Sequence, residues 1–174
     1  MTPAQLGAAA AGMRRAFDQT FAAPEPPPAG ESDDFLAVRV GGRPFAVPVL
    51  DLARVESRRK VVALPGSHPW LLGLASTQGH VVPVFSLELV LGLPATPVAK
   101  PWLVVCGRDE PFGLAFEALE GYTRVPRAAV LGAAEPDAPR AVHAAGGLRP
   151  VVSLSAVAAA VRSVVSGRKP SGGS

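Results

Sequence analysis

Residues 79–87 read Gly-His-Val-Val-Pro-Val-Phe-Ser-Leu, and residues 146–154 repeat the pattern as Gly-Gly-Leu-Arg-Pro-Val-Val-Ser-Leu. The prolines at the centres of these stretches lie 67 positions apart. The same spacing separates Arg-Pro-Phe-Ala-Val at residues 43–47 from Glu-Pro-Phe-Gly-Leu at residues 110–114. Two matches at one spacing predict that a single β-rich module occurs twice in the chain.

The spacing also relates single apolar positions outside these stretches, since it carries Leu36 onto Leu103. It holds at one value across about fifty residues, which predicts a tandem repeat with no insertion between the aligned blocks. The first copy covers about residues 35–93 and the second about residues 102–165. Two copies predict a pseudo-symmetric pair of small subdomains.

The composition excludes several classes of protein. Hydrophobic residues make up 48% of the 174 residues, but 19 prolines and 18 glycines interrupt the chain too often for a helical bundle. No apolar run approaches the roughly 18 residues of a membrane span, and the N-terminus has no signal pattern, so we expect a soluble cytoplasmic protein without membrane insertion. The net charge of +3 is spread out and provides no basic stripe for nucleic acid.

Short strands separated by turn residues dominate the local pattern. Alternating segments flank Gly41-Gly42 and, further on, Gln78-Gly79, so each set predicts a β-hairpin. Closing the four or five short strands of each copy into a barrel would remove their exposed edges. The predicted fold is mainly β, with two pseudo-symmetric five-stranded SH3-like β-barrels. We also expect a short strand at residues 61–64 and one helical turn at residues 69–73.

Helices are predicted at both ends of the chain. Residues 1–22 form an amphipathic helix with an apolar stripe that includes Leu6, Met13 and Phe17. This stripe either packs on the body of the protein or docks on a partner. The proline-rich, acidic residues 23–34 form a solvated linker that includes Asp33 and Asp34, residues 155–165 form a C-terminal helix, and residues 166–174 form a disordered tail.

The sequence shows no arrangement suited to catalysis. Cys106 lies in an apolar run, so we interpret it as a buried small hydrophobe and not a nucleophile. Ser86 and Ser153 occupy the same place in the two copies, which favours turn or cap residues. The three histidines have no metal-ligand spacing, and the Gly-Gly pairs lack the lysine of a phosphate loop. We expect no enzyme activity, no cofactor and no metal.

The central motifs of the repeat resemble the CheW-like domain of bacterial chemosensory adaptors. Residues 76–87 lie where that family has Asn-Leu-Arg-Gly, three residues, Pro, two residues and Asp-Leu. Residues 112–117 resemble the Gly-hydrophobic-acid strand of its second barrel. The resemblance covers about residues 35–165, which leaves out the N-terminal helix, the linker and the tail.

The resemblance implies two intertwined five-stranded barrels and an adaptor function. Such an adaptor bridges the cytoplasmic tip of a methyl-accepting chemoreceptor, which docks at an apolar groove near the barrel junction, to the regulatory domain of a CheA-type histidine kinase. Similar faces on opposite sides would also let the module form homo-oligomers or arrays. The alternative is a structural, polarity or motility scaffold that recruits a partner through its N-terminal helix without a kinase.

Three departures from the family pattern predict a specialised adaptor. Gln78 replaces the expected arginine, Arg54 stands where the family often has an acid, and Ser86 replaces the usual aspartate. We expect the partner groove to be near Leu52, Arg54, Val55, Gln78, Trp102 and Leu103, with Leu6, Met13 and Phe17 on the helix as further contacts. The alternation of Leu52, Val55 and Leu103 also fits ordinary core residues.

Overall fold

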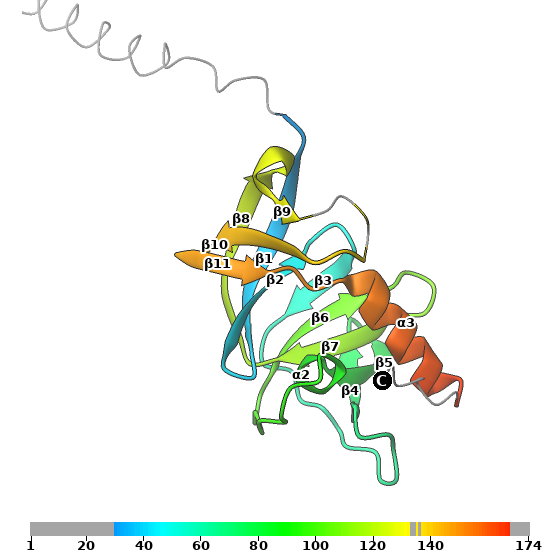
Figure 1. Cartoon of the computed structure of the whole chain (residues 1–174). Coiled ribbons are helices and arrows are strands. Elements are labelled where there is room, and N and C mark those ends of the chain that lie inside the picture. The colour runs from blue at the N-terminus through cyan, green and yellow to red at the C-terminus, as the bar shows by residue number, and fades with distance from the viewer. Residues whose placement is uncertain (1–29, 133–134, 136, 168–174) are drawn as a thin grey trace, which may run out of the picture. The chain divides into compact units, whose positions relative to one another are not determined.

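The computed structural model describes residues 30–132, 135 and 137–167 (Figure 1). The first copy contains β1 (Ser32–Val40), β2 (Arg43–Pro48), β3 (Leu52–Glu56), β4 (Leu71–Thr77), β5 (His80–Ser86) and the short helix α2 (Leu87–Val90). The second contains β6 (Trp102–Cys106), β7 (Phe112–Phe116), β8 (Ala118–Pro126), the 3-10 helix η1 (Arg127–Ala129), β9 (Leu131–Gly132), β10 (Arg140–Ala144), β11 (Gly147–Pro150) and helix α3 (Leu154–Val165). The predicted N-terminal helix and most of the predicted tail lie outside the described residues.

The strands form two small barrel units, which confirms the predicted mainly β architecture. The first barrel combines the sheets β2-β1-β8 and β11-β10-β9, which a parallel bridge between Ala46 and Val151 connects. The second barrel is the five-stranded sheet β3-β6-β7-β5-β4. Its parallel pair, Val84 with Gly113, is the exact counterpart in sequence of the bridge between Val151 and Ala46. The repeat in the sequence is therefore also a repeat in the strand pairing.

Neither barrel consists of one copy alone. The hairpin β1–β2 of the first copy pairs with strands of the second copy, and the hairpin β6–β7 of the second copy pairs with β3 and β5 of the first. The expectation that each copy closes on itself is wrong, and the intertwined arrangement that the family resemblance implied is confirmed. Because the copies exchange hairpins, neither barrel can be complete without the other half of the chain.

The repeat also contains a one-residue shift that the sequence comparison missed. Leu36 pairs with Val47 in the first hairpin, and the corresponding pair in the second hairpin is Val104 with Leu114. β1 and β6 are therefore related by 68 positions, whereas the strands after them keep a spacing of 67. The run Trp102–Cys106 is apolar throughout, so a shift of one residue still aligned apolar positions with each other.

Turns and caps recur at equivalent places. Gln78 and Gly79 have φ of 50° and 80° in the β4–β5 turn, and Ala145 and Gly146 have 46° and 79° in the β10–β11 turn. Two successive positive φ values match the twist of a two-residue hairpin loop, as predicted for Gln78-Gly79. The hydroxyl of Ser86 accepts a hydrogen bond from the backbone of Leu89 and caps α2. Ser153 caps α3 in the same way.

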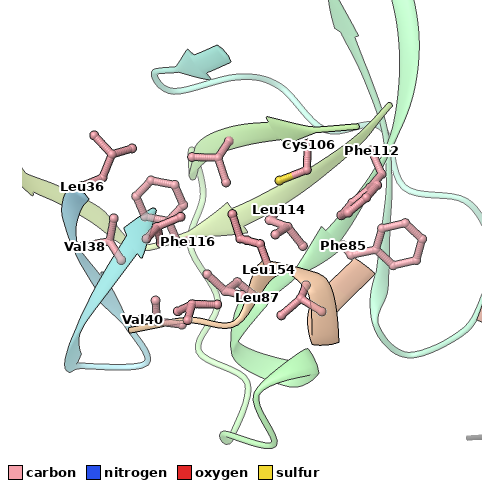
Figure 2. Close-up of a cluster of buried hydrophobic side chains, with 14 of the residues drawn as sticks. Leu36, Val38, Val40, Phe85, Leu87, Cys106, Phe112, Leu114, Phe116 and Leu154 are labelled. Carbon is pink, nitrogen blue, oxygen red and sulfur yellow. The ribbon is translucent and has the colours of Figure 1, made fainter. Parts of the chain in front are cut away.

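Three apolar clusters hold the fold together. The largest lies between the barrels, where Leu36 and Val38 of β1 pack with Leu114, Phe116 and other residues of the second barrel (Figure 2). Helix α3 contributes Leu154, Val157 and Val161 to this cluster. Phe35 and Val142 belong to a cluster within the first barrel, and Leu103 and Val84 to one within the second. The packing therefore joins the two barrels through a shared core.

Several local expectations are corrected. Leu71 and Gly73 are strand residues of β4 that pair with Phe85 and Val84, because ladder pairing to β5 outweighs a lone helical turn. Residues 61–64 provide only one bridge, from Val62 to Leu74. Asp33 and Asp34 belong to β1, which begins at Ser32 and therefore includes the last residues of the predicted linker. None of the helices in the described ranges is long and apolar enough to cross a membrane.

Candidate partner-binding surface

Polar side chains close the second barrel between its two edge strands, β3 and β4. Arg54 Nη1 donates to Thr77 Oγ1 at 2.9 Å, and that hydroxyl donates to Glu56 Oε1 at 2.5 Å. Arg59 Nε completes the chain with a 2.5 Å ion pair to Glu56 Oε2. Thr77 and Glu56 are buried, so these bonds satisfy polar groups that would be costly to leave without partners. Arg54 is thereby fixed at the edge of the barrel.

A hollow of about 480 Å³ lies beside this bridge. Its apolar lining includes Ala53, Val82 and Val105, and its polar lining includes Arg54, Thr77, His80, Arg108 and Asp109. Gln78 lies between Thr77 and His80, in the turn next to the hollow. The structure thus brings two of the predicted partner residues, Arg54 and Gln78, to one place. Arg108 and His80 were missed, although both carry polar groups next to hairpin turns.

The other predicted partner residues of the barrels lie in different surroundings. Leu52 and Trp102 are partly buried against the core between the barrels, and they pair with residues at opposite ends of the β6–β7 hairpin. Val55 is 37% exposed on β3. Leu103 is fully buried, in agreement with the core alternative. Leu6, Met13 and Phe17 lie outside the described residues.

A second, mostly apolar groove of about 450 Å³ lies where the barrels meet. Its lining includes Val40 of the first barrel, Phe116 of the second, Leu89 of α2 and residues 95–99, which connect α2 to β6. Glu88 also lines it and is 8% exposed, with Oε2 accepting from the Thr96 backbone at 2.9 Å. Sequence reasoning missed these residues, because they meet only when the two copies exchange hairpins.

The first barrel has a cluster of three charged residues at its bulge. Glu120 Oε1 accepts from Arg39 Nε and Nη2 at 2.9 and 2.6 Å, and Glu120 Oε2 pairs with Arg149 Nη1 at 2.6 Å. The hydrogen bond from Arg149, followed by that from Arg39, lowers the pKa of Glu120 below its ordinary value. Arg149 is only 5% exposed and also donates to the carbonyls of Ala144 and Val38, at 2.9 and 3.0 Å.

Each barrel exposes a matched pair of apolar side chains. Val55 and Val81 of the second barrel are 37% and 67% exposed. Their counterparts in the first barrel, Tyr122 and Leu148, are 59% and 51% exposed. Exposed apolar residues are unremarkable singly, but their repetition at equivalent places gives the two barrels related outer surfaces.

The cysteine and the two serines that could suggest a nucleophile are either buried or used as helix caps. Burial raises the pKa of the Cys106 thiol to about 12, so the thiolate is scarce at neutral pH. Ser86 and Ser153 are helix caps, which is one of the two roles predicted for them. Within residues 30–132, 135 and 137–167, no three His, Cys, Asp or Glu side chains are grouped as metal ligands.

Comparison with known proteins agrees with this architecture. The chain is similar to the protein PilI of Pseudomonas aeruginosa, with 30% identity over 93 residues that make up 52% of each protein. It is also similar to the chemotaxis protein CheW of Helicobacter pylori, with 27% identity over 93 residues, 52% of this chain and 56% of that protein. The chain thus matches about half the length of these curated relatives.

A solved structure and a family model extend the comparison over more of the chain. The scaffolding protein TtCheW from Thermoanaerobacter tengcongensis has the same fold, with a TM-score of 0.58 at 9% identity, over 70% of this chain and 88% of that one. The model of the CheW-like domain matches residues 34–161, which include all the strands except the start of β1. The chain belongs to the CheW-like domain family.

Proposed function

We propose that the chain is a cytoplasmic, non-enzymatic adaptor of a chemosensory system. It couples the cytoplasmic tip of a methyl-accepting chemoreceptor to the regulatory domain of a CheA-type histidine kinase. Membership of the CheW-like family and similarity to the chemotaxis protein CheW of Helicobacter pylori support this function. The curated relatives are matched over only about half their length, so the partners are proposed from the surfaces of this chain.

The observation that carries the proposal is the matched exposure of apolar residues on the two barrels. Val81 and Leu148 occupy equivalent strands, and both leave more than half of the side chain exposed. A duplicated module supplies two related outer surfaces, and each of them can contact a kinase. Contacts between unlike surfaces can also extend into rings or arrays.

The groove at the barrel junction suits the receptor. Its lining is mostly apolar, it draws on both barrels, and Glu88 and Glu117 are the charged residues among those that line it. An amphipathic helix of a receptor tip can bury apolar side chains in such a groove. Kinase contacts are then assigned to the outer surfaces of the barrels.

The departures from the family pattern favour specialised partners. Arg54 is held by Thr77 with its cationic group at the hollow, where a family member with an acid would carry the opposite charge. Gln78 lacks the charge of the expected arginine. Charges at the rim of an interface select between partners more than they add affinity, so we expect this chain to discriminate against partners of the usual adaptors.

Affinity capture of the full chain from its native cells, followed by mass spectrometry, tests the proposal. We expect a histidine kinase and a chemoreceptor among the captured proteins. Val81→Glu and Leu148→Glu should each weaken capture of the kinase and leave capture of the receptor unchanged, because a charge replaces an exposed apolar contact on the outer surface of a barrel. Leu50→Glu is the matched control, since Leu50 is 86% exposed but its counterpart is the acidic Glu117. Capture of neither a kinase nor a receptor would contradict the proposal.

The second candidate function is a structural, polarity or motility scaffold. It is favoured by the apolar stripe of residues 1–22, which precedes a proline-rich linker. Deleting residues 1–30 and repeating the capture separates the two functions. An adaptor that uses its barrels keeps its kinase and receptor after the deletion, whereas a scaffold that uses its N-terminal segment loses its partner.

A further inference from the structure

The hollow beside Arg54 coincides with a difference between the two barrels. The bulge residue is Glu120 in β8 and Ala53 in β3, at equivalent places in the two ladders. The counterparts of Arg149 and Arg39 are Val82, 67 positions earlier, and Gly107, 68 positions later.

The three residues of the second barrel that replace this charged cluster all line the hollow; they are Ala53, Val82 and Gly107. The first barrel therefore fills this region with a glutamate and two arginines, and the second barrel leaves it open.

The second barrel nevertheless places cationic groups at the same region, from other positions in the sequence. Arg54 stands where the first barrel has Gly121, and Arg108 comes from the loop between β6 and β7. Two guanidinium groups and the imidazole of His80 line the hollow, against the single carboxylate of Asp109. The balance of charge favours an anionic occupant.

Both arginines have donors available for such an occupant. Arg54 is partly exposed, and only its Nη1 donates within the described part of the chain, to Thr77. Arg108 is exposed, and its side chain forms no hydrogen bond or ion pair with any other described residue. A guanidinium presents five N–H donors in a fork that matches a carboxylate, so these two side chains can bind one from two directions.

We propose that the hollow binds a glutamate side chain of a partner protein, between Arg54 and Arg108. The occupant takes the place that Glu120 fills in the first barrel, where Arg39 and Arg149 contact one carboxylate. Ala53, Val82 and Val105 provide apolar surface for its aliphatic carbons. The inference deepens the proposed function, because it names the chemistry that the partner presents to the second barrel.

A peptide titration tests the site without either proposed partner. The probe is the capped tripeptide acetyl-Gly-Glu-Gly-amide, and the neutral control is its Gln analogue. The full chain is labelled with ¹⁵N, and the amide signals are followed by NMR. We expect saturable shifts at Arg108 and His80, with the Gln peptide at least about tenfold weaker because it lacks the charge-assisted bonds.

Variants of the chain locate the binding. Arg108→Met should weaken the Glu peptide about tenfold, whereas Arg43→Met, which removes one exposed arginine from the first barrel, should leave it unchanged. Ala53→Glu supplies the missing carboxylate from the chain itself and should abolish binding while the spectrum stays that of a folded protein. These variants leave Arg54 in place, so its hydrogen bond to Thr77 is kept.

Four outcomes would overturn the inference. They are absence of saturable shifts, equal binding of the Glu and Gln peptides, binding that survives both Arg108→Met and Ala53→Glu, and tighter binding of inorganic phosphate than of the Glu peptide. The last would assign the hollow to a free anion. Since no kinase or receptor is present, failure here leaves the proposed function untouched, and failure of the capture experiment leaves this site untouched.

Discussion

Replacing Arg149 by methionine should destabilise the protein far more than the same change at Arg39. Methionine keeps much of the unbranched apolar stem of arginine but removes every donor. In Arg149→Met, the buried carbonyls of Ala144 and Val38 lose their charged donor, and Glu120 loses one of its two arginines. Arg39 has 38% of its side chain exposed, so water can replace many of the hydrogen bonds that Arg39→Met removes.

The expected losses of unfolding free energy differ by severalfold between the two variants. A buried hydrogen bond from a charged donor contributes about 1.5–3 kcal/mol, and Arg149 makes two to backbone carbonyls. Because the carbonyls can relax and Glu120 keeps Arg39, we expect Arg149→Met to cost about 3 kcal/mol of the free energy of unfolding. Arg39→Met should cost about 1 kcal/mol or less. With an m-value near 2 kcal/mol/M, the first change lowers the urea midpoint by about 1.5 M.

Urea unfolding of the full chain, followed by circular dichroism, measures both variants. The experiment repeated in acid supplies a second readout. The pKa of Glu120 is lowered in the folded state, so its ion pairs add stability above pH 4.5, and that stability is lost as the pH falls through the folded pKa. The difference in the free energy of unfolding between the natural chain and Arg149→Met should therefore become smaller below pH 4.5. Equal costs for the two variants, or a difference that widens in acid, would refute the structural role of Arg149.

Three further predictions concern other parts of the fold. Gly41→Ala should destabilise by about 1 kcal/mol more than Gly42→Ala in thermal unfolding, because both have positive φ but only the Cβ at Gly41 would meet a side chain, at 2.9 Å. Cys106 should not react with a thiol reagent at pH 8 until the protein unfolds, and rapid labelling of the folded chain would contradict its burial. Ser86→Ala and Ser153→Ala should each cost about 1 kcal/mol in urea, and no loss would show that the caps are not needed.

The duplication, the hairpins and the caps could be predicted because each has a local signal. Gln78-Gly79 supplies the backbone that a two-residue turn needs, and Ser86 and Ser153 recur at equivalent places before the helices α2 and α3. The exchange of hairpins has no such signal. Two copies with the same apolar pattern bury the same face whether a hairpin pairs with its own copy or with the other one.

The hollow and the charged cluster depend on contacts between distant residues. Arg39 and Arg149 meet Glu120 across 81 and 29 positions of sequence, and nothing nearby in the chain indicates that they share a site. The sequence pattern places Asp34 in the linker for the same reason, because its ion-pair partner Arg124 lies 90 positions away. Arg54 was singled out by the resemblance, and Arg108 becomes relevant only when the loop after β6 is placed beside β3.

Co-sedimentation measures whether this chain bridges a receptor and a kinase, as proposed. Membranes that contain the receptor are mixed with the purified kinase, with or without the full chain, and are pelleted. We expect the kinase in the pellet only when the chain is present, and the Val81→Glu and Leu148→Glu double variant should leave it in the supernatant. A kinase that stays in the supernatant with the natural chain present would show that the chain does not join the two proteins.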